Sequence, residues 1–246
     1  MNNQGQEFIE NDFIGEQTLD VIANANKFNR WMYETIKPYC RGNILEVGSG
    51  LGSISEYFVK DNYKIQLTDI RARYCSKLEE KFGDQPNVLG IESMDLIDDD
   101  FDNKFSRHFN KYETVFALNV IEHISSDVKA LENCNKLLMS GGKLIILVPS
   151  YQSLFNKFDT ELGHYRRYNK TSLSDIFVKS GYNIMHQQYF NFIGIFGWYF
   201  SGKILKRESI PSGQMELYNM FVPIFKIIDK IIRNSVGLST IIVGEK

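Results

Sequence analysis

Residues 44–58, ILEVGSGLGSISEYF, predict a strand, a glycine turn and a helix in direct succession. The strand is the apolar run 44–47, which contains a single carboxylate, Glu46. Gly48, Gly50 and Gly52 follow at alternate positions, and glycine permits both positive φ angles and a close approach of the backbone to a ligand. Such a turn directs backbone N–H groups and the positive end of the following helix at a polar ligand. The stretch therefore predicts a nucleotide-binding site.

The composition is that of an ordinary globular protein. A length of 246 residues predicts one large domain, or one core domain with a small appendage. Hydrophobic residues make up 43% of the chain and charged residues 24%, which are usual values. The net charge of −2 gives no general basic surface, so we expect no nucleic-acid partner.

The sequence carries no recognisable targeting or metal-binding signal. The N-terminal residues MNNQGQEFIENDFIGEQ are polar and acidic, and no window reaches the roughly 18 uninterrupted apolar residues of a membrane-spanning helix. Cys40, Cys75 and Cys134 are scattered and odd in number, so we expect free thiols in a reducing compartment. The four histidines have no local metal-ligand spacing. These features predict a cytoplasmic, metal-free protein.

Apolar runs alternate with helical patterns along the first 150 residues. Further strands are expected at 64–68, 88–91, 113–118 and 143–148, and helices at 21–36, 71–82 and 128–138, the last closed by Gly141 and Gly142. This alternation implies right-handed βαβ units in an open parallel sheet, whose ligands bind at the carboxyl ends of the strands. The chain positions expected at that edge are Glu46 to Gly52, Asp69, Asp95, Asn119 and the loop after Val148.

The sequence changes character after Pro149. Residues 151–170 mix aromatic with charged side chains, and a helix is expected from Thr171, as its N-cap, to Ser180. Residues 189–200 are rich in aromatics, residues 217–233 have a helical apolar pattern, and residues 238–243 are expected to return as a strand at the sheet edge. We therefore expect a flexible segment at 1–17 and a single domain at 18–246. Its lid and cap elements are expected at 151–180 and 189–235.

The glycine turn departs from the dinucleotide-binding pattern G-x-G-x-x-G, because Ser53 stands where the third glycine is required. The run EVGSGLG instead resembles the first motif of the class I S-adenosylmethionine-dependent methyltransferases. Asp69 lies seventeen residues beyond Gly52, which matches the acidic residue that accepts the ribose hydroxyls in that family. A simpler role for Asp69, as the N-cap of the helix at 71–82, stays open. The later segments NVIEHI and GGKLIILVP also resemble the family's motifs.

The resemblance implies a Rossmann-like α/β fold with S-adenosyl-L-methionine as the cofactor. The sheet would be open, mostly parallel and seven-stranded, with helices on both faces and a helical, aromatic-rich cap near the C-terminus. Asp95 would accept the adenine amine, and Asn119 would open the segment that lines the methionine part. The residues implied to bind the cofactor are Glu46, Gly48, Ser49, Gly50, Gly52, Asp69, Ile70, Met94, Asp95, Leu96 and Asn119.

A narrower likeness extends over residues 28–243. The segments FNRW, NVIEHI, LVP, LGHYRRY and GLSTIIV resemble a bacterial subgroup of type 11 and 12 methyltransferases associated with small-molecule, sugar or lipid-linked glycan modification. It implies methyl transfer to an O, N or C atom of such an acceptor, as a step of small-molecule biosynthesis. The expected acceptor-binding residues are Trp31, Tyr165, Arg166, Arg167 and Trp198.

The reaction requires in-line positioning and, for a protonated acceptor, a base. His164 is the first candidate base, because Asp159, Glu161 and the two arginines surround it, although these charges could equally pair within a lid. His123 is the second, with a structural role as the alternative.

Two other classes of protein stay open. One is a nicotinamide-binding Rossmann protein, and the other is a catalytically silent partner that binds the cofactor. Weak contact with a membrane surface is also considered, through the aromatics at 189–200 and nearby basic residues, whereas the oligomeric state is not predicted. Those basic residues are Lys203, Lys206, Arg207, Lys226 and Lys230.

Overall fold

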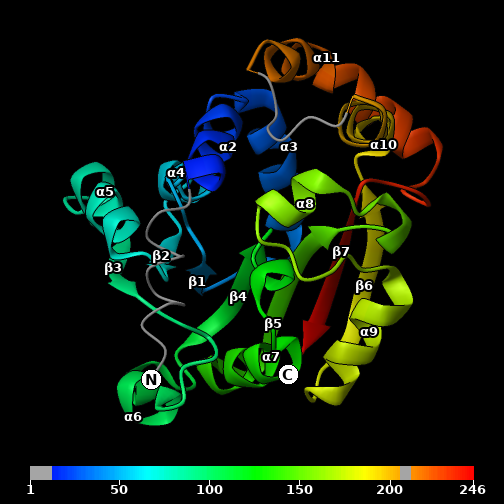
Figure 1. Cartoon of the computed structure of the whole chain (residues 1–246). Coiled ribbons are helices and arrows are strands. Elements are labelled where there is room, and N and C mark those ends of the chain that lie inside the picture. The colour runs from blue at the N-terminus through cyan, green and yellow to red at the C-terminus, as the bar shows by residue number, and fades with distance from the viewer. Residues whose placement is uncertain (1–12, 206–211) are drawn as a thin grey trace.

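The structure, a computed structural model, describes residues 13–205 and 212–246 and contains one seven-stranded sheet (Figure 1). The strands lie in the order β3-β2-β1-β4-β5-β7-β6, and β7 alone runs antiparallel to its neighbours. Their bounds are Asn43–Val47 (β1), Lys64–Asp69 (β2), Val88–Ser93 (β3), Tyr112–Leu118 (β4), Leu138–Pro149 (β5), Asn183–Phe190 (β6) and Ser239–Glu245 (β7). The predicted mostly parallel α/β sheet is confirmed.

Helices cover both faces of this sheet (Figure 1). The α-helices are Phe13–Ala23 (α2), Asn26–Ile36 (α3), Ser55–Lys60 (α4), Ala72–Phe82 (α5), Phe101–Phe105 (α6), Asp127–Leu137 (α7), Lys157–Glu161 (α8), Lys170–Lys179 (α9), Phe192–Trp198 (α10) and Ser212–Ile231 (α11). Short turns of 3₁₀-helix occupy Lys37–Tyr39 (η1), Ser106–His108 (η2), Ile121–His123 (η3) and Gln152–Leu154 (η4), and a π-helical turn, Tyr199–Ile204 (η5), continues α10. Residues 1–12, most of the segment predicted to be flexible, lie outside the described residues.

The sheet divides the apolar core into two layers, as the alternation of side chains along a strand requires. On β1, Leu45 and Val47 face the layer that contains α7 and α9, whereas Ile44 faces the layer that contains α3, α4 and α5. Both layers are closely buried: Phe177 of α9 and Phe58 of α4 are each fully inaccessible to solvent. This packing fixes the carboxyl ends of the parallel strands, where the site lies.

Some predicted element boundaries were wrong. The helix predicted at 21–36 is two helices, because the side chain of the buried Asn29 donates to the Ile22 and Ala23 carbonyls and thereby closes α2. Helix α7 ends without a glycine cap, since Leu138 is already extended at the start of β5. Gly141 and Gly142 therefore lie inside β5, where its register against β4 shifts.

Two predictions for the C-terminal half also required correction. The N-cap of α9 is Asn169, not Thr171, and its side chain forms a capping box with Ser172. Strand β7 inserts between β5 and β6 and does not form the edge of the sheet, which is β6. No helix among the described residues is both long and apolar enough to cross a membrane.

Asp229 of α11 holds the cap onto the end of β6. Its buried carboxylate accepts the backbone N–H groups of Asn191 and Phe192 at 2.6 and 2.9 Å, where α10 begins. Asn191 has a left-handed backbone, with φ of 68°, and its side chain accepts from the N–H of Gly194 and the hydroxyl of Tyr218. Burial raises the pKa of Asp229, and the two backbone hydrogen bonds oppose that shift. One side chain thus joins β6, α10 and α11.

Replacing Asp229 should loosen this junction. We expect Asp229→Ala to lower the free energy of unfolding by about 1–3 kcal/mol, because two buried N–H groups lose their acceptor. The matched control is Asp175→Ala, which removes an exposed carboxylate from α9 and should change stability by less than about 0.5 kcal/mol. Urea denaturation of the three proteins measures the difference, and equal midpoints would contradict the anchoring role.

Candidate active site

A cavity of about 1220 Å³ lies at the carboxyl ends of β1, β2, β4 and β5. Figure 1 shows α2, α3, α8, α10 and α11 gathered at this end of the sheet. The cavity is larger than the roughly 300–1,000 Å³ usual for a single small ligand, which leaves room for a cofactor and an acceptor together.

The glycine turn forms the floor of the cavity. Gly48, Gly50 and Gly52 have φ angles of 71°, 53° and 72°, a region that other residues rarely adopt. A Cβ atom on Gly48 would lie 2.4 Å from Cγ2 of Val120, so the turn also lacks space for a side chain there. Gly48 and Gly50 line the cavity. Gly52 does not line it, because it faces the Phe82 ring of α5.

Glu46 supports the turn from below. Its side chain is buried and accepts hydrogen bonds from the hydroxyls of Ser55 and Ser49. Burial raises the pKa of Glu46 to about 8, although the two hydroxyls partly offset this. The Ser49 N–H also donates to the Thr68 carbonyl of β2 at 2.8 Å. The carboxyl group therefore fixes the turn on β1 and β2 while still lining the cavity.

Asp69 links the end of β2 to the same turn. One carboxylate oxygen accepts from the Gly50 N–H and the other from the Arg71 N–H, both at 2.9 Å. Burial raises the pKa of Asp69, and these two backbone donors oppose the shift. The N-cap of α5 is Arg71, so the alternative role of Asp69 as N-cap is wrong.

The remaining residues expected to contact the cofactor follow along the same edge. Met94 and Leu96 are buried, and between them Asp95 accepts from the Ile97 N–H at 2.9 Å. Asn119, which directly follows β4, has a φ of 56° and donates its N–H to the Leu147 carbonyl of β5. The residues at this edge that line the cavity are Ile70, Met94, Asp95, Leu96 and Asn119.

Opposite the glycine turn, the chain after α8 brings His164 into the cavity. Nδ1 of His164 lies 2.8 Å from Oδ1 of Asp159, and Nε of Arg167 lies 2.7 Å from the same oxygen. Burial of Asp159 favours its neutral form, but the hydrogen bonds and charges of His164 and Arg167 prevail and lower its pKa. Arg167 also donates to the Ser150 carbonyl and lies 4.6 Å above the Trp198 ring. These contacts hold the His164 ring in a fixed orientation.

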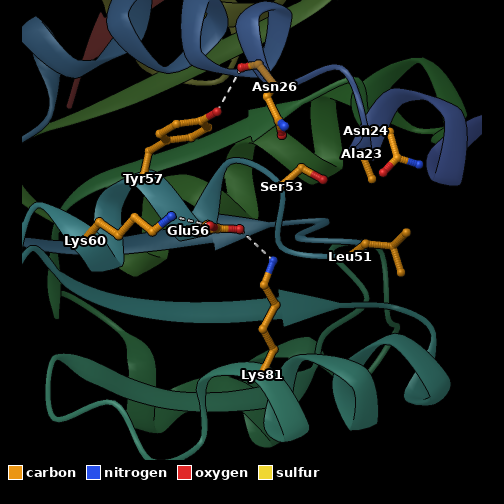
Figure 2. Close-up of a pocket in the computed structure, with 9 residues that line it drawn as sticks. All are labelled: Ala23, Asn24, Asn26, Leu51, Ser53, Glu56, Tyr57, Lys60 and Lys81. Carbon is orange, nitrogen blue, oxygen red and sulfur yellow. Dashed lines mark hydrogen bonds and ion pairs between the residues drawn. The ribbon is translucent and has the colours of Figure 1, made fainter. Parts of the chain in front are cut away.

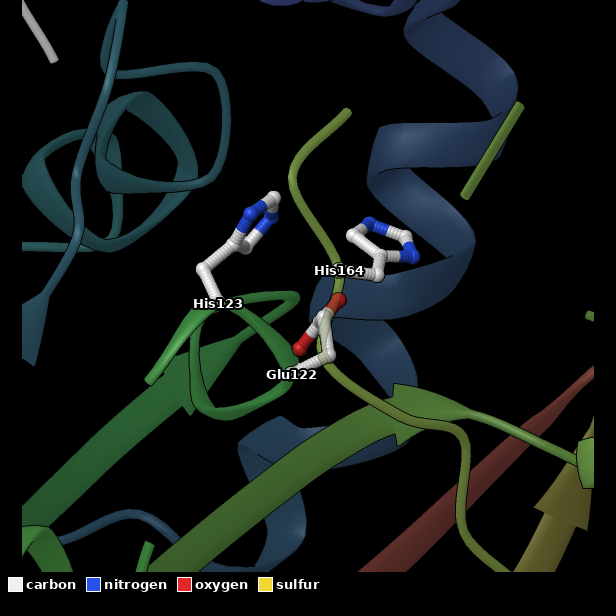
Figure 3. Close-up of side chains that lie close together, drawn as sticks. All are labelled: Glu122, His123 and His164. Carbon is white, nitrogen blue, oxygen red and sulfur yellow. The ribbon is translucent and has the colours of Figure 1, made fainter. Parts of the chain in front are cut away.

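His123 and Glu122, from η3, complete this wall of the cavity. The rings of His123 and His164 meet edge to face with centroids 4.6 Å apart, and Figure 3 shows the Glu122 carboxylate directed toward His164. His123 is exposed to the cavity, and the protein packed around it, together with the neighbouring His164, lowers its pKa. Burial also raises the pKa of Glu122 to about 8.

The structure does not bring every predicted acceptor residue into the cavity. Tyr165, Arg167 and Trp198 line it. Trp31 is instead buried in the core against Phe190, with ring centroids 4.3 Å apart. Arg166 points away, donating to Asp127 and to the Ser125 carbonyl. The pairing of lid charges that the sequence left open therefore holds for Arg166 and Arg167.

Sequence reasoning missed two contributors to the cavity. Helix α2 lines it through Thr18, Leu19 and Ile22, although no motif marks that helix. The Glu122 side chain was noted only as a neighbour of His123, and its burial gives it a larger part in the site. The signal that could have indicated the role of Glu122 was its position as a carboxylate inside the apolar segment NVIEHI.

A second, smaller hollow lies on the outer side of the glycine turn and is not a candidate site. It has about 380 Å³ and lies between α2, α3, α4 and α5 (Figure 2). Its charges are already paired, since Glu56 binds both Lys60 and Lys81, and the Tyr57 hydroxyl donates to the Asn26 carbonyl.

Comparisons with known proteins agree with this geometry. The family model for a methyltransferase domain matches residues 45–144. Malonyl-[acyl-carrier protein] O-methyltransferase 1 of Ilyobacter polytropus is 26% identical over 242 residues, which cover 93% of this chain and 86% of that protein. A hybrid synthetase of Talaromyces variabilis is 31% identical over 158 residues, but these cover 55% of this chain and only 4% of the synthetase.

Solved structures show the same fold. The CurJ carbon methyltransferase aligns with a TM-score of 0.55 at 17% identity, over 90% of this chain and 53% of that one. The phosphoethanolamine N-methyltransferase 2 of Haemonchus contortus, in complex with S-adenosyl-L-methionine, aligns with a TM-score of 0.58 at 16% identity, over 89% and 52%.

Fold, glycine turn and matches together define a Rossmann-like transferase. The chain carries a methyltransferase domain, and its matches support a class I S-adenosylmethionine-dependent methyltransferase with S-adenosyl-L-methionine as the cofactor. The resemblance seen in the sequence is thereby confirmed at the level of the class.

Adding a methyl group at Gly48 should disrupt the turn. We expect Gly48→Ala to weaken S-adenosylhomocysteine binding at least roughly tenfold, because the new Cβ meets Val120 and the positive φ is strained. The double variant Gly48→Ala/Val120→Ala should recover part of this loss, since only the clash is removed. Gly213→Ala, whose Cβ would meet nothing within 4 Å, is the control. Titration calorimetry decides, and unchanged affinity in Gly48→Ala would show that the turn does not contact the cofactor.

Proposed function

We propose that this enzyme methylates a proton-bearing atom, foremost an oxygen, of a small or lipid-linked acceptor that occupies the cavity beside the cofactor. The observation that carries the proposal is the group of Glu122, His123 and His164 on the wall opposite the glycine turn. A carbon or nitrogen acceptor without an acidic proton would not need such a group. The relative from Ilyobacter polytropus is named as an O-methyltransferase, which supports the choice of oxygen.

The residues at the strand ends would hold the cofactor. The glycine turn, supported by Glu46, presents its backbone N–H groups to the amino-acid end, and Asp69 accepts the ribose hydroxyls. The residues 94–96 with Ile70 flank the adenine, and Asn119 lines the methionine part. When bound, S-adenosylmethionine supplies a methyl group on a sulfonium leaving group. The remaining task of the protein is to position the acceptor and manage its proton.

His164 is proposed to face the acceptor. Since Nδ1 of His164 is engaged by Asp159, its Nε2 is the nitrogen left for the acceptor proton. His164 is favoured over His123 because the Asp159 carboxylate engages its ring, whereas His123 has a lowered pKa and is therefore a weaker base. Tyr165, Arg167 and Trp198 would then form the wall that orients the acceptor.

Replacing Asp69 tests the cofactor site. We expect Asp69→Ala to weaken S-adenosylhomocysteine binding by roughly tenfold or more, since charge-assisted hydrogen bonds contribute about 1.5–3 kcal/mol each. The control, Asp175→Ala, should leave the affinity unchanged, because that side chain is exposed on α9. In the same calorimeter NAD should show no binding. Stabilisation of the protein by NAD alone would instead favour a nicotinamide enzyme.

The cap joins the cavity to an exposed apolar surface. The inner sides of α10 and α11 line the cavity with Trp198 and Tyr218, among others. The outer sides of the same helices and of η5 expose large apolar side chains, which we call the apolar face. Its members are Phe196, Tyr199, Phe200, Ile204, Leu205, Leu217, Met220, Phe221, Ile224, Ile227 and Ile231.

We propose that the apolar face rests on the cytoplasmic surface of a membrane with anionic lipids. The exposed Lys203, Lys230 and Arg233 accompany it, whereas Lys226 is paired with Glu34. Lys206 and Arg207 lie outside the described residues. A helix with an apolar side and basic neighbours is typical of interfacial binding. Three free thiols support the cytoplasmic side. An acceptor carrying a lipid could then enter the cavity along α10 and α11.

Charge on the apolar face should abolish this contact. We expect the protein to sediment with vesicles containing anionic phosphatidylglycerol at low salt, and Ile224→Glu to reduce that binding roughly tenfold. Val178→Glu, at an equally exposed apolar residue of α9 away from the cap, is the control and should bind like the parent protein. Absence of binding at low salt, or a dimer that Ile224→Glu dissociates, would overturn the membrane proposal.

A further inference from the structure

Glu122, His123 and His164 bring two imidazoles and one carboxylate together. Their ligand atoms all lie within 4.8 Å of one another, and the residues come from two segments, η3 and the chain after α8 (Figure 3). The Tyr165 N–H donates to the Glu122 carbonyl at 2.8 Å, so a backbone hydrogen bond ties the segments together beside the cluster. The fold therefore brings His164 to the adjacent residues Glu122 and His123.

The Glu122 carboxylate lacks the partners that a buried charge requires. Its side chain is fully buried, and among the described residues neither of its oxygens has a hydrogen-bond partner. An isolated buried carboxylate is strongly disfavoured unless a proton or a cation compensates it. Arg167 is the nearest buried cation, but its guanidinium is engaged by Asp159 and by the Ser150 carbonyl. The site thus presents two unused carboxylate oxygens.

The His164 imidazole is oriented by a partner on its other side. Nδ1 of His164 lies 2.8 Å from the Asp159 carboxylate, which holds that nitrogen away from the cluster. Histidines that ligate metals show this arrangement, in which a carboxylate or a backbone carbonyl fixes the ring and its tautomer.

We propose that Glu122, His123 and His164 bind one divalent transition-metal ion. Two imidazole nitrogens and a carboxylate suit Mn²⁺, Fe²⁺, Co²⁺ or Zn²⁺ better than Mg²⁺, which prefers oxygen ligands alone. The cavity beside the three residues leaves coordination positions for an oxygen of the acceptor. The sequence prediction of a metal-free protein examined only local spacing, and these ligands come from separate segments.

The metal site deepens the proposed function and rests on it for its role in the reaction. A hydroxyl coordinated to a divalent ion loses its proton to water much more readily than a free hydroxyl. The acceptor oxygen then forms its bond to the methyl carbon, while the bond from that carbon to sulfur breaks and its electron pair stays on sulfur. In this arrangement His164 is a ligand and no longer the proton acceptor, and Asp159 positions its ring.

Metal binding can be tested without an acceptor. We expect the chelator-treated protein to bind Mn²⁺, followed by calorimetry, with a stoichiometry of one, and Co²⁺ to give the visible absorption of nitrogen and oxygen ligation. Glu122→Gln, which preserves shape, and His164→Ala should each weaken Mn²⁺ binding on the order of a hundredfold, and Asp159→Asn about tenfold or more. The control is His186→Ala on β6, which lies away from the cavity and should bind like the parent.

Binding of S-adenosylhomocysteine is measured in each variant, so that loss of the metal site can be distinguished from misfolding. If a variant still binds it while losing Mn²⁺, the protein is folded and the metal site is supported. Absence of Mn²⁺ and Co²⁺ binding, or equal binding in Glu122→Gln and the parent, would overturn the metal proposal. The methyltransferase proposal with His164 as base would then stand, whereas it fails separately if S-adenosylhomocysteine does not bind.

Discussion

Four carboxyl groups are buried around one cavity, and the described residues place only one buried arginine beside them. Glu46, Asp69, Glu122 and Asp159 are each at most 6% exposed, and Arg167 is the accompanying cation. A buried carboxylate requires hydrogen bonds, a cation or a proton, so each acid has to be compensated by its own local structure. The shape of the site follows from the way in which these requirements are met.

Three of the four buried carboxyl groups are compensated, each by different donors. Glu46 receives the hydroxyls of Ser55 and Ser49, which fasten the glycine turn to the strand below it. Asp69 receives two backbone N–H groups, one of them from the turn itself. Asp159 receives Arg167 and His164, and so orients the ring that enters the cavity. In each case the compensation of one charge also positions a segment that lines the site. Glu122 alone has no such donor among the described residues.

The sequence was sufficient to predict whatever depends on local pattern. The strand, turn and helix at 44–58, the acid at the end of β2 and the alternation up to β5 all follow from short-range spacing, and the structure agrees. Contacts between distant segments were beyond that reasoning. The insertion of β7 beside β5 depends on pairing with residues 90 to 102 positions earlier, from Pro149↔Ser239 to Lys143↔Glu245. Trp31 was assigned to the acceptor from a motif, but its packing against Phe190 decides its place.

The lid shows why residue type alone did not separate its two arginines. Arg166 and Arg167 are adjacent, yet one reaches outward to Asp127 and the other inward to Asp159. The Arg167 side chain is buried, whereas the Arg166 side chain is partly exposed, and the sequence does not show this difference. Tyr165 lines the cavity and is 60% exposed, while the neighbouring His164 side chain is largely buried against Asp159.

One geometric condition therefore unites the lid and the strand ends. The backbone hydrogen bond from Tyr165 to Glu122 fixes the position of the lid relative to η3. It thereby places His164 beside the uncompensated Glu122 carboxylate. A shift of the lid by one residue would place Tyr165 or Gly163 there instead and would remove His164, one of the two imidazoles, from beside Glu122. The register of this contact thus places His164 in the cluster. It also explains why the cluster cannot be read from spacing within either segment.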